Sequence, residues 1–162
     1  FLLFPLVAFA YQNPGTPTGF VNDFAGMLTA EQKHSLEIKI SGFEKDTSNE
    51  LTVVTVSNLG GDTIENFAVK LFEEWKIGKA KNDNGILLLI SRDDHKIRIE
   101  VGYGLEGAVP DATAFSIITN ILTPAFKQGD YFGGINSATD AIISATKGEY
   151  QPKENNSNIT EL

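Results

Sequence analysis

The sequence contains no cysteine, only two histidines, and few basic side chains for its length. Without cysteine there is no thiol nucleophile, no cysteine-ligated zinc and no disulfide. Two histidines, His34 and His95, are too few for a histidine-rich metal site. Lys and Arg number 13 against 21 Asp and Glu, which gives a net charge of -8. Because binding to nucleic-acid phosphates requires a basic face, we expect no nucleic-acid partner.

The apolar content is sufficient for one folded domain. The chain has 162 residues, and 41% of them are hydrophobic, which supports a single domain with a buried core. We divide the chain into a residual signal-peptide region (1–10), a Pro/Gly/Thr linker (11–19), the folded domain (20–148) and a polar tail (149–162). The tail is rich in Asn and Glu, and we expect it to be disordered. The acidic surface suits solubility or cation binding.

The first ten residues form an apolar run that is too short to cross a bilayer. The run ends in Ala8-Phe9-Ala10 before a polar stretch, and small residues at that spacing are typical of a signal-peptidase cleavage site. We interpret residues 1–10 as the end of a secretory signal peptide, and a buried N-terminal strand is the alternative. Export predicts a secreted or periplasmic protein that begins near Tyr11 and has no transmembrane segment.

Hydrophobic periodicity predicts alternating helices and strands in the rest of the chain. Thr29 is a hydroxyl N-cap for a helix that continues to about Asp46, and Asp62-Thr63 begins a second helix with one broad apolar stripe. We expect Asp111 to cap a third helix, which Pro124 ends, and a fourth helix covers residues 131–146. The expected strands cover 50–56, 85–90 and 96–101.

The order of these elements predicts an α/β fold with a mixed, mostly parallel sheet. The strands at 50–56 and 85–90 flank a helix, so they form a β-α-β crossover and run parallel. Residues 85–90 are apolar on both faces, as in a strand that is covered on both sides. The strand at 96–101 follows a short polar turn, so we expect it to run antiparallel beside 85–90.

A glycine-rich run, 102–107, closes that antiparallel hairpin and marks the first candidate site. Glycines at this spacing indicate a tight bend or a close approach of the backbone. In the expected hairpin the run lies beside 82–84, which brings Asp83, Glu106 and Asp111 together. Carboxylates, amides and exposed carbonyls are the ligands that Ca²⁺ prefers. The chain has no EF-hand pattern, so this hypothesis depends on predicted proximity.

Simpler interpretations of the same residues remain open. Asp111 follows a proline and is well placed to cap a helix, a role that is compatible with cation binding. Asp83 is also typical of an ordinary turn before a strand. The glycine run has the spacing of a dinucleotide fingerprint, but it follows an antiparallel strand, so we expect no such cofactor. We expect Trp75 in the core and His95 in a solvated loop.

The opposite edge of the sheet offers a second candidate site. Ligands of open α/β sheets usually bind beyond the carboxyl ends of the parallel strands. Polar and acidic side chains follow both strands there, and sequence alone does not choose between the edges. These residues are Ser57, Asn58 and Asp62 after the first strand and Arg92, Asp93 and Asp94 after the second.

Four motifs follow one another between about residues 20 and 148. They are Val21-Asn22-Asp23-Phe24-Ala25-Gly26 with Leu28-Thr29, Trp75-Lys76-Ile77-Gly78, Asn82-Asp83-Asn84-Gly85-Ile86-Leu87-Leu88, and Arg98-Ile99-Glu100-Val101-Gly102-Tyr103-Gly104-Leu105-Glu106-Gly107 with Pro110-Asp111. In these motifs and in their order the chain resembles the TPM domain family of exported, lumenal or membrane-anchored proteins.

The resemblance implies a Rossmann-like three-layer α/β/α sandwich and a divalent cation, Ca²⁺ or another, as cofactor. By motif position it implies Asp23, Asp83 and Asp111 as ligands, with Glu106 as an addition. The expected topology puts the start of the first helix at the far edge, so either the segment before it crosses the sheet or Asp23 has a separate role. Two function classes follow. The first is an extracytoplasmic calcium-binding module that acts through a protein partner in envelope or membrane-complex maintenance.

The second class is a metal-assisted acid phosphatase on phosphomonoesters, an activity attributed to a plant thylakoid-lumen member of the family. In such an enzyme the cation would polarise the phosphoryl oxygens. Phosphoryl transfer also needs positive groups, and the candidates near the glycine run are Lys76, Lys79, Lys81 and Arg98. The sequence names no catalytic residue.

Overall fold

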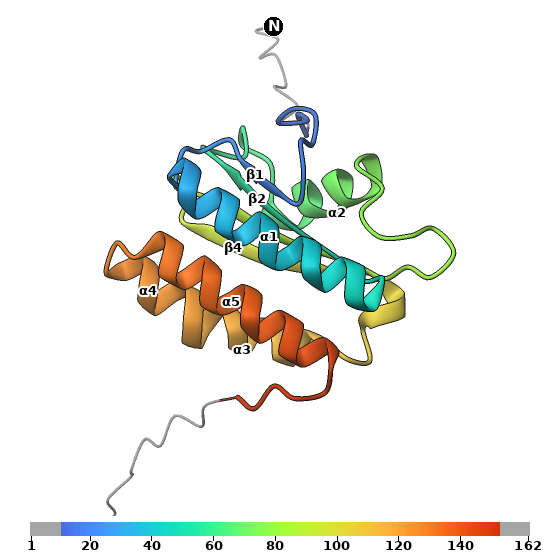
Figure 1. Cartoon of the computed structure of the whole chain (residues 1–162). Helices are drawn as coiled ribbons and strands as arrows, with labels where there is room; N and C mark the ends of the chain where they lie inside the picture. Colours follow the sequence, from blue (N-terminus) through green and yellow to red (C-terminus); the bar gives the residue numbers. More distant parts are fainter. Residues whose placement is uncertain (1–10, 153–162) are drawn as a thin grey trace, which may run out of the picture.

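Four strands form a mixed sheet in the computed structural model, which describes residues 11–152 (Figure 1). In spatial order they are β1 (Val21–Asp23), β2 (Glu50–Val56), β3 (Gly85–Ser91) and β4 (Lys96–Val101). The β1–β2 and β2–β3 pairs are parallel, and β3–β4 is antiparallel. The predicted crossover and hairpin are therefore both confirmed.

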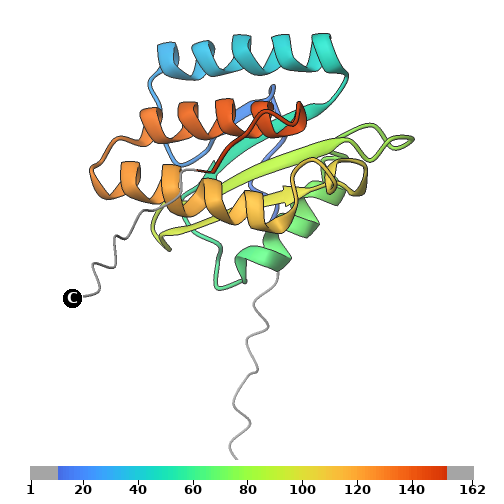
Figure 2. The ribbon, with the colours of Figure 1, turned by 90° about the horizontal axis from the view of Figure 1, so that it is seen from below.

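Helices cover both faces of this sheet. On one face lie α1 (Ala30–Thr47), α3 (Asp111–Ile117), α4 (Thr123–Lys127) and α5 (Tyr131–Thr146), and on the other lies α2 (Ile64–Glu74) (Figures 1 and 2). All seven residues of β3 are buried, because this central strand is covered on both sides. The result is the expected Rossmann-like α/β/α sandwich.

Local sequence signals explain where two of the helices begin. The Thr29 hydroxyl accepts a hydrogen bond from the backbone N–H of Gln32, whose side chain accepts one from the Thr29 N–H, and this capping box starts α1. Thr63 caps α2 in a similar way by accepting from the Asn66 N–H. The predicted helix starts at these two positions are confirmed.

The structure corrects the expected end of the third helix. Pro124 does not end it: a π-helical turn, η2 (Ile118–Leu122), follows α3 and leads directly into α4, which contains Pro124 near its start. Proline is tolerated in the first turn of a helical segment, where its missing N–H is not needed. The wider π turn resets the hydrogen-bond pattern just before the proline, so the chain remains helical to Lys127.

Asp111 does not cap α3 as expected. Pro110 occupies the N-cap position, Asp111 is the first helical residue, and no side chain hydrogen-bonds to the free N–H groups at this end. The Asp111 carboxylate therefore interacts with the helix only through its negative charge near the N-terminus. Its oxygens remain available for another role.

The strand β1 was not expected from the sequence. It has only three residues, too few for an alternating pattern, and it forms by pairing with β2, where Asp23 lies opposite Thr55. The segment before it, predicted as a linker, packs on the α2 side: the Tyr11 ring meets Phe67 edge to face at 4.9 Å between centroids.

Several predictions concern parts of the chain outside the described residues. The interpretation of residues 1–10 as a signal peptide falls there, as does most of the polar tail from residue 153 onward. Within residues 11–152, none of the helices combines the length and the apolar character that a membrane span requires.

Candidate functional site

The glycine run packs directly against the loop before β3, as predicted. The Gly104 N–H donates to the Asp83 carbonyl at 3.0 Å, and the Gly102 N–H donates to the Gly85 carbonyl at 2.8 Å. A Cβ atom at Gly102 would collide with the Asp83 carbonyl oxygen, and one at Gly104 with the Asn82 carbonyl oxygen. Glycine is required here because the two backbones touch.

A polar pocket of about 310 Å³ opens beside this loop pair, between β4 and the start of α3. Glu106 and Asp111 line it together, and both are exposed. Neither carboxylate has a hydrogen-bond or ion-pair partner among residues 11–152. Arg98 and Glu100 line the same pocket and form an ion pair at 2.8 Å. We refer to this pocket as the amino-edge pocket, because β3 begins at this edge of the sheet.

Asp83 lies next to the amino-edge pocket but is not one of its lining residues. It is exposed, and its φ of 45° places it in the left-handed region, a conformation that Asp tolerates better than most residues. Within the described part of the chain, no three His, Asp or Glu side chains are positioned to hold a metal ion. The structure thus brings Glu106 and Asp111 together and leaves Asp83 beside them.

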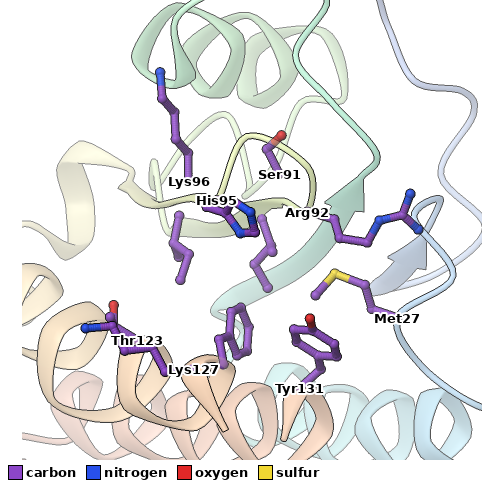
Figure 3. Close-up of a pocket in the computed structure, with 11 residues that line it drawn as sticks. Met27, Ser91, Arg92, His95, Lys96, Thr123, Lys127 and Tyr131 are labelled. Carbon is purple, nitrogen blue, oxygen red and sulfur yellow. The ribbon is translucent and has the colours of Figure 1, made fainter. Parts of the chain in front are cut away.

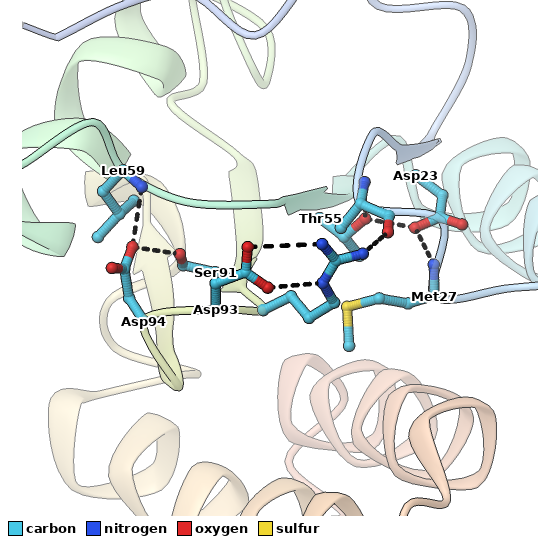
Figure 4. A network of polar contacts seen from close by, with 9 residues as sticks. Asp23, Met27, Thr55, Leu59, Ser91, Asp93 and Asp94 are labelled. Carbon is cyan, nitrogen blue, oxygen red and sulfur yellow. Dashed lines mark hydrogen bonds and ion pairs between the residues drawn. The ribbon is translucent and has the colours of Figure 1, made fainter.

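Asp23, the fourth predicted ligand, lies at the opposite edge of the sheet (Figure 4). Its carboxylate accepts hydrogen bonds from the backbone N–H groups of Met27 at 3.0 Å and Leu28 at 2.9 Å, and from the Thr55 hydroxyl. These bonds hold the turn that leads from β1 into α1. Asp23 therefore shares no site with Asp111, and its oxygens are occupied.

The other acidic residues at this carboxyl edge are also engaged in structural contacts. Asp94 accepts hydrogen bonds from the Ser91 hydroxyl at 2.7 Å and from the Leu59 N–H at 2.8 Å, and these bonds hold the pKa of Asp94 below its usual value. Arg92 pairs with Asp93, lowering the pKa of that carboxyl. Arg92 also donates to the Ala25 carbonyl (Figure 4).

The remaining polar residues of the carboxyl edge stabilise the loop after β2. The Asn58 side chain accepts from the Gly60 N–H at 2.9 Å, and Asp62 accepts from Thr63 and Asn66 before α2. The Ser57 carbonyl accepts from the Asp93 N–H at 2.9 Å, which joins the loops after β2 and β3. Hydrogen bonds within the chain therefore account for the polar character of this edge.

Some features of both edges were not found from the sequence. The Arg98–Glu100 pair points into the amino-edge pocket from alternate positions of β4, a pattern that indicated only a charged strand face. The bond between Thr55 and Asp23 joins residues 32 positions apart. No local motif marks such a contact, because it depends on the register of β1 against β2.

Comparison with known proteins places these motifs in one family. The family model described as the TPM domain matches residues 21–145. Among curated proteins, none matches the chain.

Three solution NMR structures are similar to the chain. The N-terminal domain of a Porphyromonas protein (P. gingivalis) is 31% identical, with a TM-score of 0.77, covering 86% of this chain and 94% of that one. The BA42 protein of the psychrophilic bacterium Bizionia argentinensis is 24% identical, with a TM-score of 0.66 and coverage of 80% and 88%. The N-terminal domain of the cg2496 protein of Corynebacterium glutamicum is 16% identical, with a TM-score of 0.60 and coverage of 91% and 90%.

Proposed function

The chain belongs to the TPM domain family, and on that premise we propose that it is a module that binds a divalent cation, Ca²⁺, in the amino-edge pocket. The observation that carries the proposal is the pair Glu106 and Asp111. Two carboxylates line one polar pocket, and neither has a partner among residues 11–152. The whole chain has a net charge of -8. Unneutralised carboxylates that line the same pocket favour a cation there.

Calcium fits this environment better than a cation of stricter geometry. Ca²⁺ takes six to eight oxygen ligands in flexible arrangements, whereas Mg²⁺ demands a near-ideal octahedron and keeps its waters. Glu106 and Asp111 supply carboxylate oxygens, and Asp83 adds a third acid next to the pocket. Water would complete the shell, so we expect weak binding, with a Kd on the order of 10⁻⁴–10⁻³ M, as in extracellular calcium modules.

Asp23 is not part of the proposed cation site. Its two oxygens already accept three hydrogen bonds at the carboxyl edge. A cation there would compete with the backbone N–H groups of Met27 and Leu28 for the same carboxylate, and displacing them would cost free energy. The proposed protein ligands are therefore Glu106 and Asp111, and Asp83, which does not line the pocket, could act only through its charge.

We further propose that the module works outside the cytoplasm through a protein partner that maintains an envelope or membrane complex. Two apolar side chains support a protein contact next to the pocket. Tyr103 is 81% exposed and Phe115 is 68% exposed. Phe115 lies four residues after Asp111, on the same face of α3, so a partner that covers these rings would also cover the cation. The apolar run ending in Ala8-Phe9-Ala10 supports export.

A calcium titration followed by residue-resolved NMR tests the cation site. We expect saturable shifts at the amides of 82–85 and 102–112, and a higher Tm when Ca²⁺ is present. Glu106→Gln and Asp111→Asn should remove most of that rise in Tm, because each deletes a negative charge without changing size. Asp46→Asn is the matched control, an equal loss of charge at an exposed position of α1. Shifts confined to the carboxyl edge, or no shifts, would contradict the proposal.

A second candidate function, a metal-assisted phosphatase, is favoured by the position of Arg98. Its guanidinium lines the amino-edge pocket with Glu106 and Asp111, so a positive group is available next to the proposed cation. Glu100 neutralises much of that charge, which makes this the weaker candidate. If it is correct, calcium-dependent hydrolysis of p-nitrophenyl phosphate should fall in Arg98→Gln and in Asp111→Asn. Activity that survives both changes would come from a contaminant.

A further inference from the structure

A second cavity, of about 400 Å³, lies at the carboxyl edge and takes no part in the proposed cation site (Figure 3). It is formed where the turn between β3 and β4 faces the connection between α4 and α5. Its lining residues are Met27, Ile90, Ser91, Arg92, His95, Lys96, Ile97, Thr123, Phe126, Lys127 and Tyr131. The volume lies in the range of small-molecule sites, about 300–1,000 Å³.

The interior of this cavity is apolar. Ile90 from β3, Ile97 from β4 and Phe126 from α4 contribute hydrocarbon surface, and the Met27 side chain closes one side. Ile90 is buried, while Ile97, Phe126 and Met27 are partly exposed to the open space. Such a surface favours the burial of an apolar group, at roughly 25 cal/mol for each Å² removed from water.

Basic side chains gather around this cavity in a chain that is otherwise acidic. Arg92, Lys96 and Lys127 are among its lining residues together with His95, and none of the lining residues is Asp or Glu. This absence is informative because acids outnumber Lys and Arg by 21 to 13 in the whole chain.

The polar groups at the mouth are not equally free to bind a ligand. Arg92 is held by Asp93 and by the Ala25 carbonyl, so its charge is largely neutralised. The Lys96 ammonium points away from the cavity in Figure 3, whereas His95 and the Tyr131 hydroxyl border its opening. Within residues 11–152, the side chains of His95, Lys127 and Tyr131 make no hydrogen bond or ion pair, although Asp93 is close enough to interact electrostatically with the His95 imidazole.

We propose that this cavity binds a small amphipathic monocarboxylate. The aryl or short alkyl group occupies the space between Ile97 and Phe126, and the carboxylate lies at the mouth, where it accepts hydrogen bonds from His95 and Tyr131. Lys127, whose side chain extends away from His95 and Tyr131 in Figure 3, adds a longer-range positive field. The ligand carries a single negative charge because the Arg92–Asp93 pair is internally neutral. A phosphate dianion would need a cluster of free donors that the mouth does not provide.

An NMR titration with 4-phenylbutyrate tests the proposal, and 4-phenylbutanol and 4-phenylbutylamine serve as neutral and cationic controls of the same shape. The experiment is done with EDTA and without calcium, so its outcome is independent of the cation site. We expect saturable shifts at 91–97 and 123–131 with the acid, and weaker binding of the alcohol and the amine. Equal affinity for acid and alcohol, or no saturable shift at these amides, would overturn the proposal.

Three variants separate the contribution of the Lys127 charge to binding from that of the Tyr131 hydroxyl. Lys127→Glu should weaken binding of the acid by at least about threefold, and added salt should reduce this difference, since the charges are exposed. Tyr131→Phe removes only the hydroxyl and should weaken the acid more than the alcohol. Lys70→Glu, an equal charge change on the exposed surface of α2, is the matched control. If Lys70→Glu and Lys127→Glu weaken binding equally, the effect is that of net charge and the assignment to this cavity is wrong.

Discussion

The acidic residues at the two edges of the sheet are used in different ways. At the carboxyl edge, Asp23 and Asp94 accept hydrogen bonds from backbone N–H groups and hydroxyls, and they hold the turns together. At the amino edge, Glu106 and Asp111 face a pocket and have no partner within the described chain. A carboxylate that is already hydrogen-bonded contributes to stability, whereas one without a partner is available for a ligand. The number of acids in a loop therefore says little about function.

At the amino edge, stability depends on the close contact between the backbones of two loops. The largest predicted loss of stability comes from breaking this contact. In Gly102→Ala the new methyl group would collide with the Asp83 carbonyl, so one of the two loops must move. We expect a loss of about 1–3 kcal/mol in the free energy of unfolding, measured by urea denaturation. Gly107→Ala is the control, because a Cβ there has open space around it. Equal losses in the two variants would show that the loops do not need their close contact.

The carboxyl edge should lose stability when Asp23 is removed. Asp23→Ala leaves the N–H groups of Met27 and Leu28 and the Thr55 hydroxyl without their acceptor. Hydrogen bonds to a charged group contribute about 1.5–3 kcal/mol, so we expect a loss of about 2 kcal/mol. Thr55→Val keeps the shape but removes the donor to Asp23 and the acceptor of the Ala25 N–H, two hydrogen bonds rather than three, and should cost less. If Asp23→Ala is neutral, the contrast between the two edges fails.

The pH dependence of stability provides a smaller test of the same edge. The pKa of Asp94 is lowered in the folded protein by its bonds from Ser91 and Leu59. A group with a depressed folded pKa adds stability that is present above its unfolded pKa, about 3.9, and is lost as the pH falls through the folded value. Asp94→Asn should therefore flatten the acid limb of the stability curve below about pH 4, as followed by circular dichroism. An unchanged acid limb would argue against a role for Asp94.

The smallest effect on stability is expected at the proposed ligands. Without calcium, Glu106→Gln and Asp111→Asn should change the free energy of unfolding by no more than about 0.5 kcal/mol, because exposed groups without partners contribute little. Calorimetry with and without Ca²⁺ measures both this value and the loss of the calcium response. A large loss in the absence of calcium would mean that these carboxylates are structural, like those of the carboxyl edge.

Local patterns were sufficient to predict most of the elements. The Thr29 N-cap, the apolar stripe of α2 and the strand β3 with two apolar faces each depend on residues close in sequence, and the structure confirms all three. The strand β1 was missed because three residues carry no period, and Pro124 was misinterpreted because a π turn before it restores a helical path. Both errors arise where tertiary packing outweighs local preference.

The candidate sites were likewise predicted in part from local sequence and decided in part by tertiary packing. The hairpin from β3 to β4 placed the glycine run beside Asp83, so the neighbourhood of Glu106 and Asp111 followed from sequence alone. The motif containing Asp23 suggested a fourth ligand, but the parallel pairing of β1 with β2 carries this residue to the other edge. Which acids retain free oxygens also depends on contacts over long separations, such as that between Asp23 and Thr55.

Composition and periodicity alone determined that this chain forms an acidic α/β domain without thiol chemistry, and motifs alone pointed to its family. Only the tertiary structure decided which carboxylates within residues 11–152 lack partners, and that basic side chains gather around the mouth of one cavity in an acidic protein. That mouth joins His95 to Lys127 and Tyr131, segments about 30 residues apart. Short-range patterns record how each segment folds, whereas a site depends on which segments the sheet and its covering helices bring together.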